Sequence, residues 1–232
     1  SSAASDVYKR QQLVFHLAAL LGATDPDTIH RVNVDGTRNM TAAAARMLVP
    51  LRRFVFVSST AAIGPSGRDE KLDENADPRP VTEYGRSKLR AERVVRRSSG
   101  FPWTILRLPL VYGPNSRGGL ITFFKLINRR IQLILPEAET NVAFVGDVAE
   151  GLARAAFCPE AAGRTFHLGE KQVYGLRQVS REIRNALGKP TLKIPLPYPI
   201  LFGLAFACEA WATVLRRTPA LKRKNLSLIH IS

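Results

Sequence analysis

Short apolar runs alternate along this chain with segments of helical periodicity. Apolar runs occupy residues 12–19, 53–59 and 103–112, whereas residues 27–47 carry apolar side chains at helical spacing and residues 83–97 are strongly charged with a few apolar positions. Parallel strands need a crossover connection, which is usually a helix, so this alternation predicts βαβ units. We expect an α/β protein with a mostly parallel sheet.

Beyond residue 114 the pattern is less regular. The sequence predicts shorter elements there, namely helices near 120–129, 147–157 and 179–187 and strands near 142–145 and 163–169. Residues 64–80 are polar and rich in Gly, Pro and Asp, which indicates a loop.

An apolar segment that begins at Pro195 predicts one more helix. Its uninterrupted apolar run from Ile200 ends at Glu209, well short of the roughly 20 residues that a membrane-spanning helix needs. We expect a helix that is buried against the rest of the protein. The alternative is a helix on a membrane surface, since a basic cluster follows and would favour anionic lipid. The cluster comprises Arg216, Arg217, Lys222, Arg223 and Lys224.

Composition narrows the class of protein and its partners. A hydrophobic content of 45% excludes a disordered, collagen-like or coiled-coil protein. Two cysteines argue against a disulfide scaffold and favour a reduced, cytoplasmic setting, and the four histidines do not stand at metal-ligand spacing, so we expect no metal site. The net charge of +15 comes from scattered residues without aromatic interleaving or a recognition helix, so we expect no nucleic-acid partner.

Both ends of the chain look foreign to the protein. Residues 1–11 resemble the in-frame translation of a transposase adapter used for short-read sequencing libraries, and residues 226–232 resemble the same adapter in reverse complement. Adapter-derived segments are excluded from fold reasoning. We interpret residues 12–225 as an internal fragment of a longer protein.

Three residues form the sharpest chemical pattern. Ser59 stands at the end of an apolar strand, and Tyr84 and Lys88 lie four residues apart at the start of the next predicted helix. This spacing places two side chains on one helix face, one turn apart. A cationic neighbour favours phenolate, so we expect Lys88 to lower the pKa of Tyr84 from about 10 toward the range of a general base. The alternative is an ordinary solvated helix face.

Further stretches give this pattern its context. They are HLAA at 16–19, NVDGT at 33–37, FVFVSSTAAIG at 54–64, YGRSK at 84–88, LRLPLVYGP at 106–114 and FVGDVAEG at 144–151. With these stretches in this order, the chain resembles the extended short-chain dehydrogenase/reductase superfamily, which includes NAD-dependent epimerases, dehydratases and 3-beta-hydroxysteroid-dehydrogenase-like members. The resemblance implies a Rossmann-like, mostly parallel sheet with helices on both faces, plus a smaller C-terminal substrate-binding region.

The resemblance also implies roles for particular residues. Tyr84 would be the catalytic acid/base, Lys88 its electrostatic partner and a ligand of the nicotinamide ribose, and Ser59 a hydrogen-bonding partner of the substrate oxygen, with Ser58 or Thr60 as alternatives to Ser59. The cofactor would be NAD or NADP. The residues expected to bind it are Leu17, Ala18, Ala19, Asn33, Ser58, Tyr84, Lys88 and Pro109. For the two alanines, Asn33 and Pro109, the alternative is a purely structural role.

Two features of a dinucleotide site are absent from the sequence. It contains no glycine-rich GxxGxxG or GxGxxG turn for the pyrophosphate and no position that would select between NAD and NADP. We expect the first strand-helix units to lie upstream, so that residues 12–114 form a partial dinucleotide-binding domain and residues 115–225 complete the sheet and form the substrate lobe. The chain alone would then be inactive, and activity would belong to a parent protein, which we expect to be a homodimer.

Two substitutions bear on the substrate. Where members that act on nucleotide sugars carry an Asn and a diphosphate-binding Arg, this chain has Leu110 and Thr140. A buried diphosphate needs charge-assisted partners, so these differences favour an NAD(P)-dependent oxidoreductase of a small, less polar alcohol or ketone. The alternatives are a nucleotide-sugar epimerase or dehydratase and a non-catalytic dinucleotide sensor, although the presence of Tyr84 and Lys88 argues against the sensor.

Overall fold

The computed structural model describes most of the chain between residues 12 and 206. The described residues are 12–21, 25–47, 49–65, 72–116, 120–136, 139–197, 199–200, 202–203 and 206. The chain divides into two compact units: it passes from the first to the second after Leu108, returns at Gly146 and leaves again after Leu168. The single boundary near residue 114 stays a prediction.

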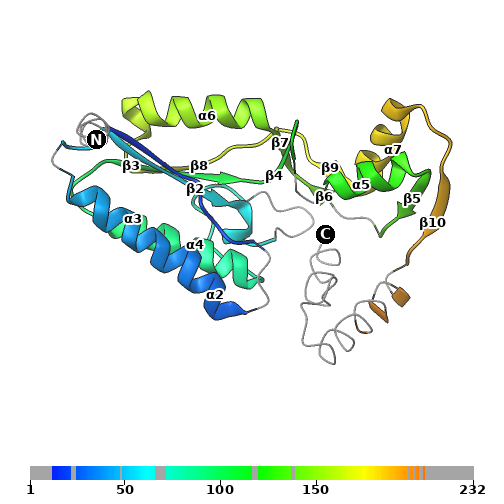
Figure 1. Ribbon diagram of the computed structural model, residues 1–232, viewed down its shortest axis with the longest axis horizontal. Coiled ribbons are helices and arrows are strands. Elements are labelled where there is room, and N and C mark those ends of the chain that lie inside the picture. Colours follow the sequence, from blue (N-terminus) through cyan, green and yellow to red (C-terminus); the bar gives the residue numbers. More distant parts are fainter. Residues whose placement is uncertain are drawn as a thin grey trace, which may run out of the picture. The chain divides into compact units, whose positions relative to one another are not determined.

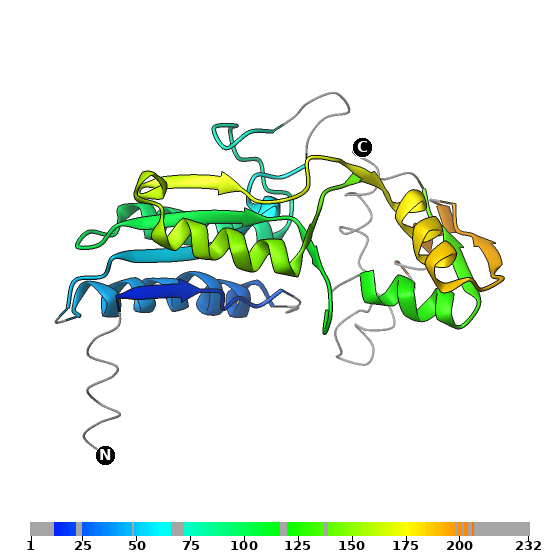
Figure 2. The same ribbon diagram turned by 90° about the horizontal axis from the view of Figure 1, so that it is seen from above.

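A parallel sheet forms the centre of the first unit. Its strands stand in the order β1 (Leu13–His16), β2 (Arg53–Ser59), β3 (Trp103–Leu108) and β8 (Arg164–His167), side by side in Figure 2. On one face lie α3 (Gly36–Ala45) and α4 (Glu83–Arg97), and on the other lies α6 (Val145–Phe157), as Figure 1 shows. The 3₁₀ turn η3 (Pro159–Ala161) leads from α6 to β8. The predicted α/β class, with a parallel sheet covered on both faces, is confirmed.

The segment predicted as one helix over residues 27–47 consists of two α-helices joined by a π-helical turn. Its first part, α2 (Pro26–His30), is capped by Asp25, whose carboxylate accepts hydrogen bonds from the backbone N–H groups of Asp27 and Thr28 at 3.1 and 3.0 Å. The π-helical turn η1 (Arg31–Asp35) then joins α2 to α3. Such turns are rare and frequently mark functional sites.

Helix α4 packs closely on the turn after β2 because it carries a glycine near its start. Thr82 caps the helix, its hydroxyl accepting a hydrogen bond from the N–H of Gly85 at 3.0 Å. A Cβ atom at Gly85 would collide with the carbonyl oxygen of Ala61 in the 3₁₀ turn η2 (Thr60–Ala62). Glycine therefore permits the close approach that brings Tyr84 to the end of β2.

Apolar side chains between the sheet and α4 form the core of the first unit. Phe54 and Phe56 from β2 and Ile105 from β3 are fully buried with Ala91 and Val95 of α4. Complete burial of a large apolar side chain contributes about 1.5–3 kcal/mol. This core holds α4 against β2 and so fixes the geometry of the site between them.

Short strands and helices make up the described part of the second unit. β4 (Leu110–Tyr112) pairs in parallel with β7 (Val142–Phe144), β5 (Ile131–Ile134) in parallel with β10 (Leu192–Pro195), and β6 (Glu139–Thr140) antiparallel with β9 (Tyr174–Gly175). The helices of this unit include α5 (Leu120–Asn128) and α7 (Leu176–Leu187).

Two predictions about prolines and strand ends are wrong. The strand predicted over residues 103–112 stops at Leu108, and Pro109 separates β3 from β4, because proline has no N–H for the sheet ladder. Pro195 is the last residue of β10 rather than the first of a helix, and the first described helical residue after it is Pro199.

Other expectations fall on parts of the chain that the structure leaves out. Residues 1–11 and 226–232, predicted to be adapter-derived, lie outside the described residues, as do the basic cluster that begins at Arg216 and most of the apolar segment after Pro195. None of the helices in the described ranges combines the length and apolar character needed to cross a bilayer.

Candidate active site

Ser59, Tyr84 and Lys88 come together at the carboxyl end of β2. The side chains of Tyr84 and Ser59 are hydrogen-bonded to each other. The Lys88 ammonium donates to the carbonyl oxygen of Val57, two residues before Ser59, at 2.6 Å. Ser59 Oγ also accepts a hydrogen bond from the N–H of Ala61 at 3.2 Å, which fixes its orientation at the start of η2. The structure thus groups the three residues whose catalytic roles the sequence predicts.

Lys88 is a buried cation. Lys88 is 2% exposed, and its Nζ lies 4.3 Å from the centroid of the Phe56 ring. Burial lowers the pKa of Lys88 to about 8, and the charge of Glu92 acts in the opposite direction. Lys88 is therefore mostly an ammonium at neutral pH and loses its charge at moderately alkaline pH.

Tyr84 does not have the lowered pKa that the sequence predicts. Burial raises the pKa of Tyr84 above its ordinary value of 10.0, and the hydrogen bond with Ser59 offsets this only in part. The Lys88 ammonium is bound to the Val57 carbonyl. The expectation is therefore wrong for the chain as described: Tyr84 is a neutral phenol at neutral pH.

Asn33 ties the segment after β1 to α4. Its amide nitrogen donates to the carbonyl of Leu20 at 3.0 Å and to Ser87 Oγ at 2.9 Å, and its Oδ1 accepts from the N–H of Leu20 at 2.7 Å. Asn33 is 2% exposed and lies in η1. The contacts show that it holds backbone beside the site, whereas its role in cofactor binding stays a prediction.

The remaining predicted cofactor residues differ in exposure. Leu17, Ala18 and Ala19 directly follow β1 at the carboxyl end of the sheet, where Leu17 is 53% exposed and Ala18 is exposed too. Pro109 directly follows β3 and is partly buried. Leu17 and Ala18 are thus accessible at the carboxyl end of β1. The contact of all four residues with a cofactor stays a prediction.

Ser58 belongs to a buried ion cluster that the sequence analysis missed. Its hydroxyl donates to Glu92, which also binds Arg96 and Arg107. Alternate residues of a strand share a face, so the Ser58 hydroxyl lies on the face of β2 that carries Phe54 and Phe56 and packs against α4. Two signals could have revealed the cluster: Glu92 follows Lys88 by one helical turn, and Arg107 interrupts the apolar run of β3.

His16 is a core residue with a satisfied side chain. Its Nε2 lies 2.9 Å from Thr37 Oγ1. Burial, followed by the charge of Lys88, lowers the pKa of His16 to about 4. The ring is therefore neutral at physiological pH.

Comparison with protein families identifies the family of this chain. The model of the NAD dependent epimerase/dehydratase family matches residues 1–169, more than half of the sequence. The chain belongs to the NAD-dependent epimerase/dehydratase family. The resemblance to the extended short-chain dehydrogenase/reductase superfamily is thereby confirmed.

Members of this family with known sequences or structures are similar over most of the chain. An N-acetyl-alpha-D-glucosaminyl-diphospho-ditrans,octacis-undecaprenol 4-epimerase of Escherichia coli O157:H7 is 28% identical over 83% of the chain and 61% of its own length. A Synechocystis protein provisionally named a dihydroflavonol 4-reductase is 29% identical, over 94% and 66%. The crystal structure of Thermus thermophilus UDP-glucose 4-epimerase in complex with NAD is 26% identical with a TM-score of 0.70, over 84% and 68%. The chain spans about three fifths of the length of several curated relatives.

The carboxyl end of the sheet fits the nicotinamide-ribose part of a dinucleotide. Dinucleotides bind at the carboxyl ends of parallel strands. Here the buried Lys88 offers a cationic donor near the carboxyl end of β2, and the exposed Leu17 and Ala18 follow the neighbouring strand β1. The chain has no glycine-rich turn to fit the pyrophosphate part. In the part of the chain that the structure describes, no three His, Cys, Asp or Glu side chains are grouped so that they could hold a metal ion.

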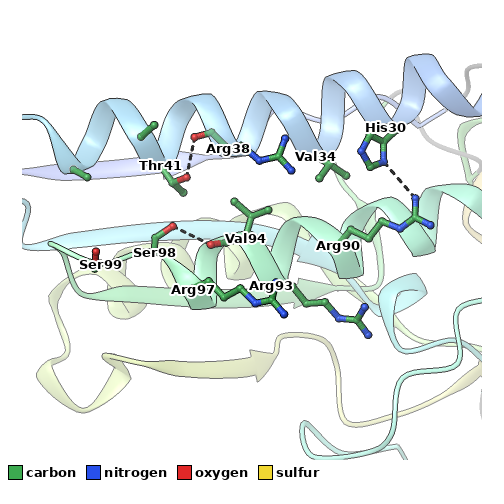
Figure 3. Close-up of a pocket in the computed structure, with 12 residues that line it drawn as sticks. His30, Val34, Arg38, Thr41, Arg90, Arg93, Val94, Arg97, Ser98 and Ser99 are labelled. Carbon is green, nitrogen blue, oxygen red and sulfur yellow. Dashed lines mark hydrogen bonds between the residues drawn. The ribbon is translucent and has the colours of Figure 1, made fainter.

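A concave region of the first unit is lined by none of the predicted site residues. This groove of about 620 Å³ lies between α3 and α4 and carries four arginines, Arg38, Arg90, Arg93 and Arg97, around apolar side chains that include Val34 and Val94 (Figure 3). A second copy docked face to face on the groove would bring like charges together. The predicted homodimer, if it used this face, would have to overcome that repulsion.

Proposed function

We propose that the full-length protein is an NAD(P)-dependent oxidoreductase that transfers hydride at a secondary alcohol or ketone carbon of a small substrate. The observation on which the proposal rests is the hydrogen bond between Tyr84 and Ser59 beside the buried Lys88, at the carboxyl end of β2. Membership of a family defined by NAD dependence supports it.

Each of the three side chains has its own role in the proposed mechanism. In ketone reduction, the Tyr84 phenol donates its proton to the substrate oxygen, while the Ser59 hydroxyl donates a hydrogen bond that stabilises the negative charge developing there. In alcohol oxidation, the Tyr84 phenolate would take the hydroxyl proton, and the positive charge of a bound oxidised nicotinamide would favour that phenolate. Lys88 supplies positive charge and would bind the ribose hydroxyls of the cofactor. The chemistry that a bound nicotinamide supplies is the reversible uptake of a hydride from the substrate carbon.

A nucleotide-sugar epimerase is the second candidate, and the names of relatives favour it. The Escherichia coli and Thermus relatives are both 4-epimerases. The same proton and hydride transfers would run twice, through a keto intermediate. Leu110 in β4 and Thr140 in β6 argue against it, because Leu110 offers no polar contact to the substrate and Thr140 offers no charge to a diphosphate.

Product analysis with the full-length protein separates the two candidates. The protein would be incubated with NAD or NADP and, in turn, with secondary alcohols, ketones and nucleotide sugars. We expect a stoichiometric change in reduced-nicotinamide absorbance with a small, less polar alcohol or ketone. An inverted sugar without net absorbance change would establish the epimerase instead. Failure to convert any of these substrates would contradict both, and would leave the non-catalytic sensor.

A further inference from the structure

A buried carboxylate with four hydrogen-bond donors lies next to the proposed active site. Glu92 Oε1 accepts from Ser58 Oγ at 2.6 Å and from Arg107 Nε at 2.9 Å, and Oε2 accepts from Nη2 of Arg107 and of Arg96, both at 2.8 Å. Glu92 is 0% and Arg107 is 2% exposed. Charge-assisted hydrogen bonds to a carboxylate, including a bidentate pair from one arginine, are strong and directional.

These bonds attach the helix that carries Tyr84 and Lys88 to three strands of the sheet. Ser58 lies in β2 and Arg107 in β3, and Arg96 also donates to Thr165 Oγ1 in β8 at 3.1 Å. Tyr84, Lys88, Glu92 and Arg96 follow one another at intervals of four residues and so share one face of α4. The position of Glu92 therefore sets the position of Lys88, one turn earlier. Ser58, bound to Glu92, is covalently linked to Ser59.

Glu92 is also the acidic group that acts on Lys88. Burial raises the pKa of the Glu92 carboxyl, but hydrogen bonds and charge from Arg107, together with Ser58 and Arg96, outweigh it and hold the pKa below 4.5, so Glu92 is ionised at neutral pH. From the other elements, β1 presents His16, which is neutral, and β2 presents the uncharged Val57 carbonyl and Phe56 ring. Arg107 of β3 is paired with Glu92 itself.

We propose that Glu92 is a positioning residue of the hydride-transfer site, which locks α4 to β2 and β3 and places a negative charge one helical turn from the Lys88 ammonium. The inference rests on the proposed function, since a charged Lys88 matters for turnover only if Tyr84 and Lys88 act in catalysis. It extends that function by making a residue outside the reacting groups responsible for the alkaline limit of activity.

The direct test is an NMR titration of Lys88 in protein labelled with carbon-13 at lysine, with the signal assigned by a Lys88→Met variant. Without the Glu92 charge, Lys88 should titrate below its wild-type value of about 8, by about one pH unit, the usual size of such shifts. Glu92→Gln alone leaves Arg107 buried without its carboxylate partner and could unfold, so the double variant Glu92→Gln with Arg107→Gln is measured too. It is compared with Arg107→Gln alone, so that the loss of the Arg107 charge cancels. Glu92→Asp, which keeps the charge, should restore the wild-type value.

A matched control separates this effect from a general change of charge. Glu150 and Arg154 of α6 form an exposed pair at the same four-residue spacing as Glu92 and Arg96, so Glu150→Gln should leave the Lys88 titration unchanged. In the full-length protein, the alkaline limb of the pH profile of kcat/KM should lie at lower pH in the double variant than in Arg107→Gln, and should stay at its wild-type position in Glu150→Gln.

The outcomes distinguish this inference from the proposed function. If Tyr84→Phe abolishes turnover but Lys88 titrates at the same pH in the folded double variant as in Arg107→Gln, the role of Glu92 is overturned and the function stands. If Tyr84→Phe leaves turnover intact, the proposed function falls, and the positioning role of Glu92 falls with it.

Discussion

The Tyr84→Phe variant of the full-length protein is expected to lose about 10²- to 10⁴-fold in kcat/KM, the usual contribution of a positioned acid or base. The substitution removes one oxygen atom, which forms the hydrogen bond with Ser59, and keeps the ring that packs at the start of α4. The fold should therefore persist while proton transfer is lost. Steady-state kinetics measure the loss, and a circular dichroism spectrum verifies folding.

Tyr174→Phe provides the matched control for this variant. Tyr174 lies in β9, and its hydroxyl donates to Glu170. Removing this hydroxyl should leave kcat/KM near the wild-type value, because the loss in Tyr84→Phe comes from one reacting group and not from a missing tyrosine oxygen in general. Equal activity of the two variants would remove Tyr84 from the mechanism.

The Arg107→Met variant is expected to lose about 3–5 kcal/mol in the free energy of unfolding, which is the usual cost of removing one partner of a buried ion pair. The change leaves the Glu92 carboxylate, which is 0% exposed, without the arginine that binds both of its oxygen atoms. Urea denaturation followed by circular dichroism measures the difference from wild type at neutral pH.

The pH dependence of that difference has a definite sign. In the wild type the pKa of Glu92 lies below 4.5, so its stabilising contribution is complete above this pH and is lost as the pH falls through the lowered pKa. In Arg107→Met, burial would instead raise the pKa of Glu92, and protonation in acid would relieve the penalty. The difference in the free energy of unfolding between variant and wild type should therefore decrease as the pH falls toward about 4.

The exposed pair on α6 is the control for the stability measurement. Arg154→Met breaks the contact with Glu150, whose side chain is 61% exposed, and should cost at most about 0.5 kcal/mol. Equal losses in the Arg107 and Arg154 variants would show that the buried cluster does not stabilise the fold.

Local sequence patterns predicted the elements of the first unit but not all of the second. The helix predicted over residues 83–97 and the strand predicted over 53–59 match α4 and β2, because each has a sustained apolar or charged pattern of its own. β5 and β10 were not predicted. Each has only four residues, and its pairing partner lies far away in the sequence, so no local pattern marks it.

The candidate site was predictable where spacing decides and unpredictable where burial decides. The four-residue spacing of Tyr84 and Lys88 indicated a shared helix face, but the pKa of Tyr84 depends on what covers the phenol, which no spacing reveals. Strand alternation could have indicated the contact of Ser58 with α4, because Ser58 shares a strand face with Phe54 and Phe56, which pack against that helix.

The ionisation of Tyr84, followed by NMR of full-length protein labelled with carbon-13 at the tyrosine ring, tests the proton-transfer role most directly. Without NAD, the pKa of Tyr84 should lie above 10.0. With NAD bound, the positive charge of the oxidised nicotinamide should lower the pKa of Tyr84, because a nearby opposite charge favours the phenolate. A Tyr84 titration that bound NAD leaves unchanged would contradict the assignment of this phenol as the acid/base.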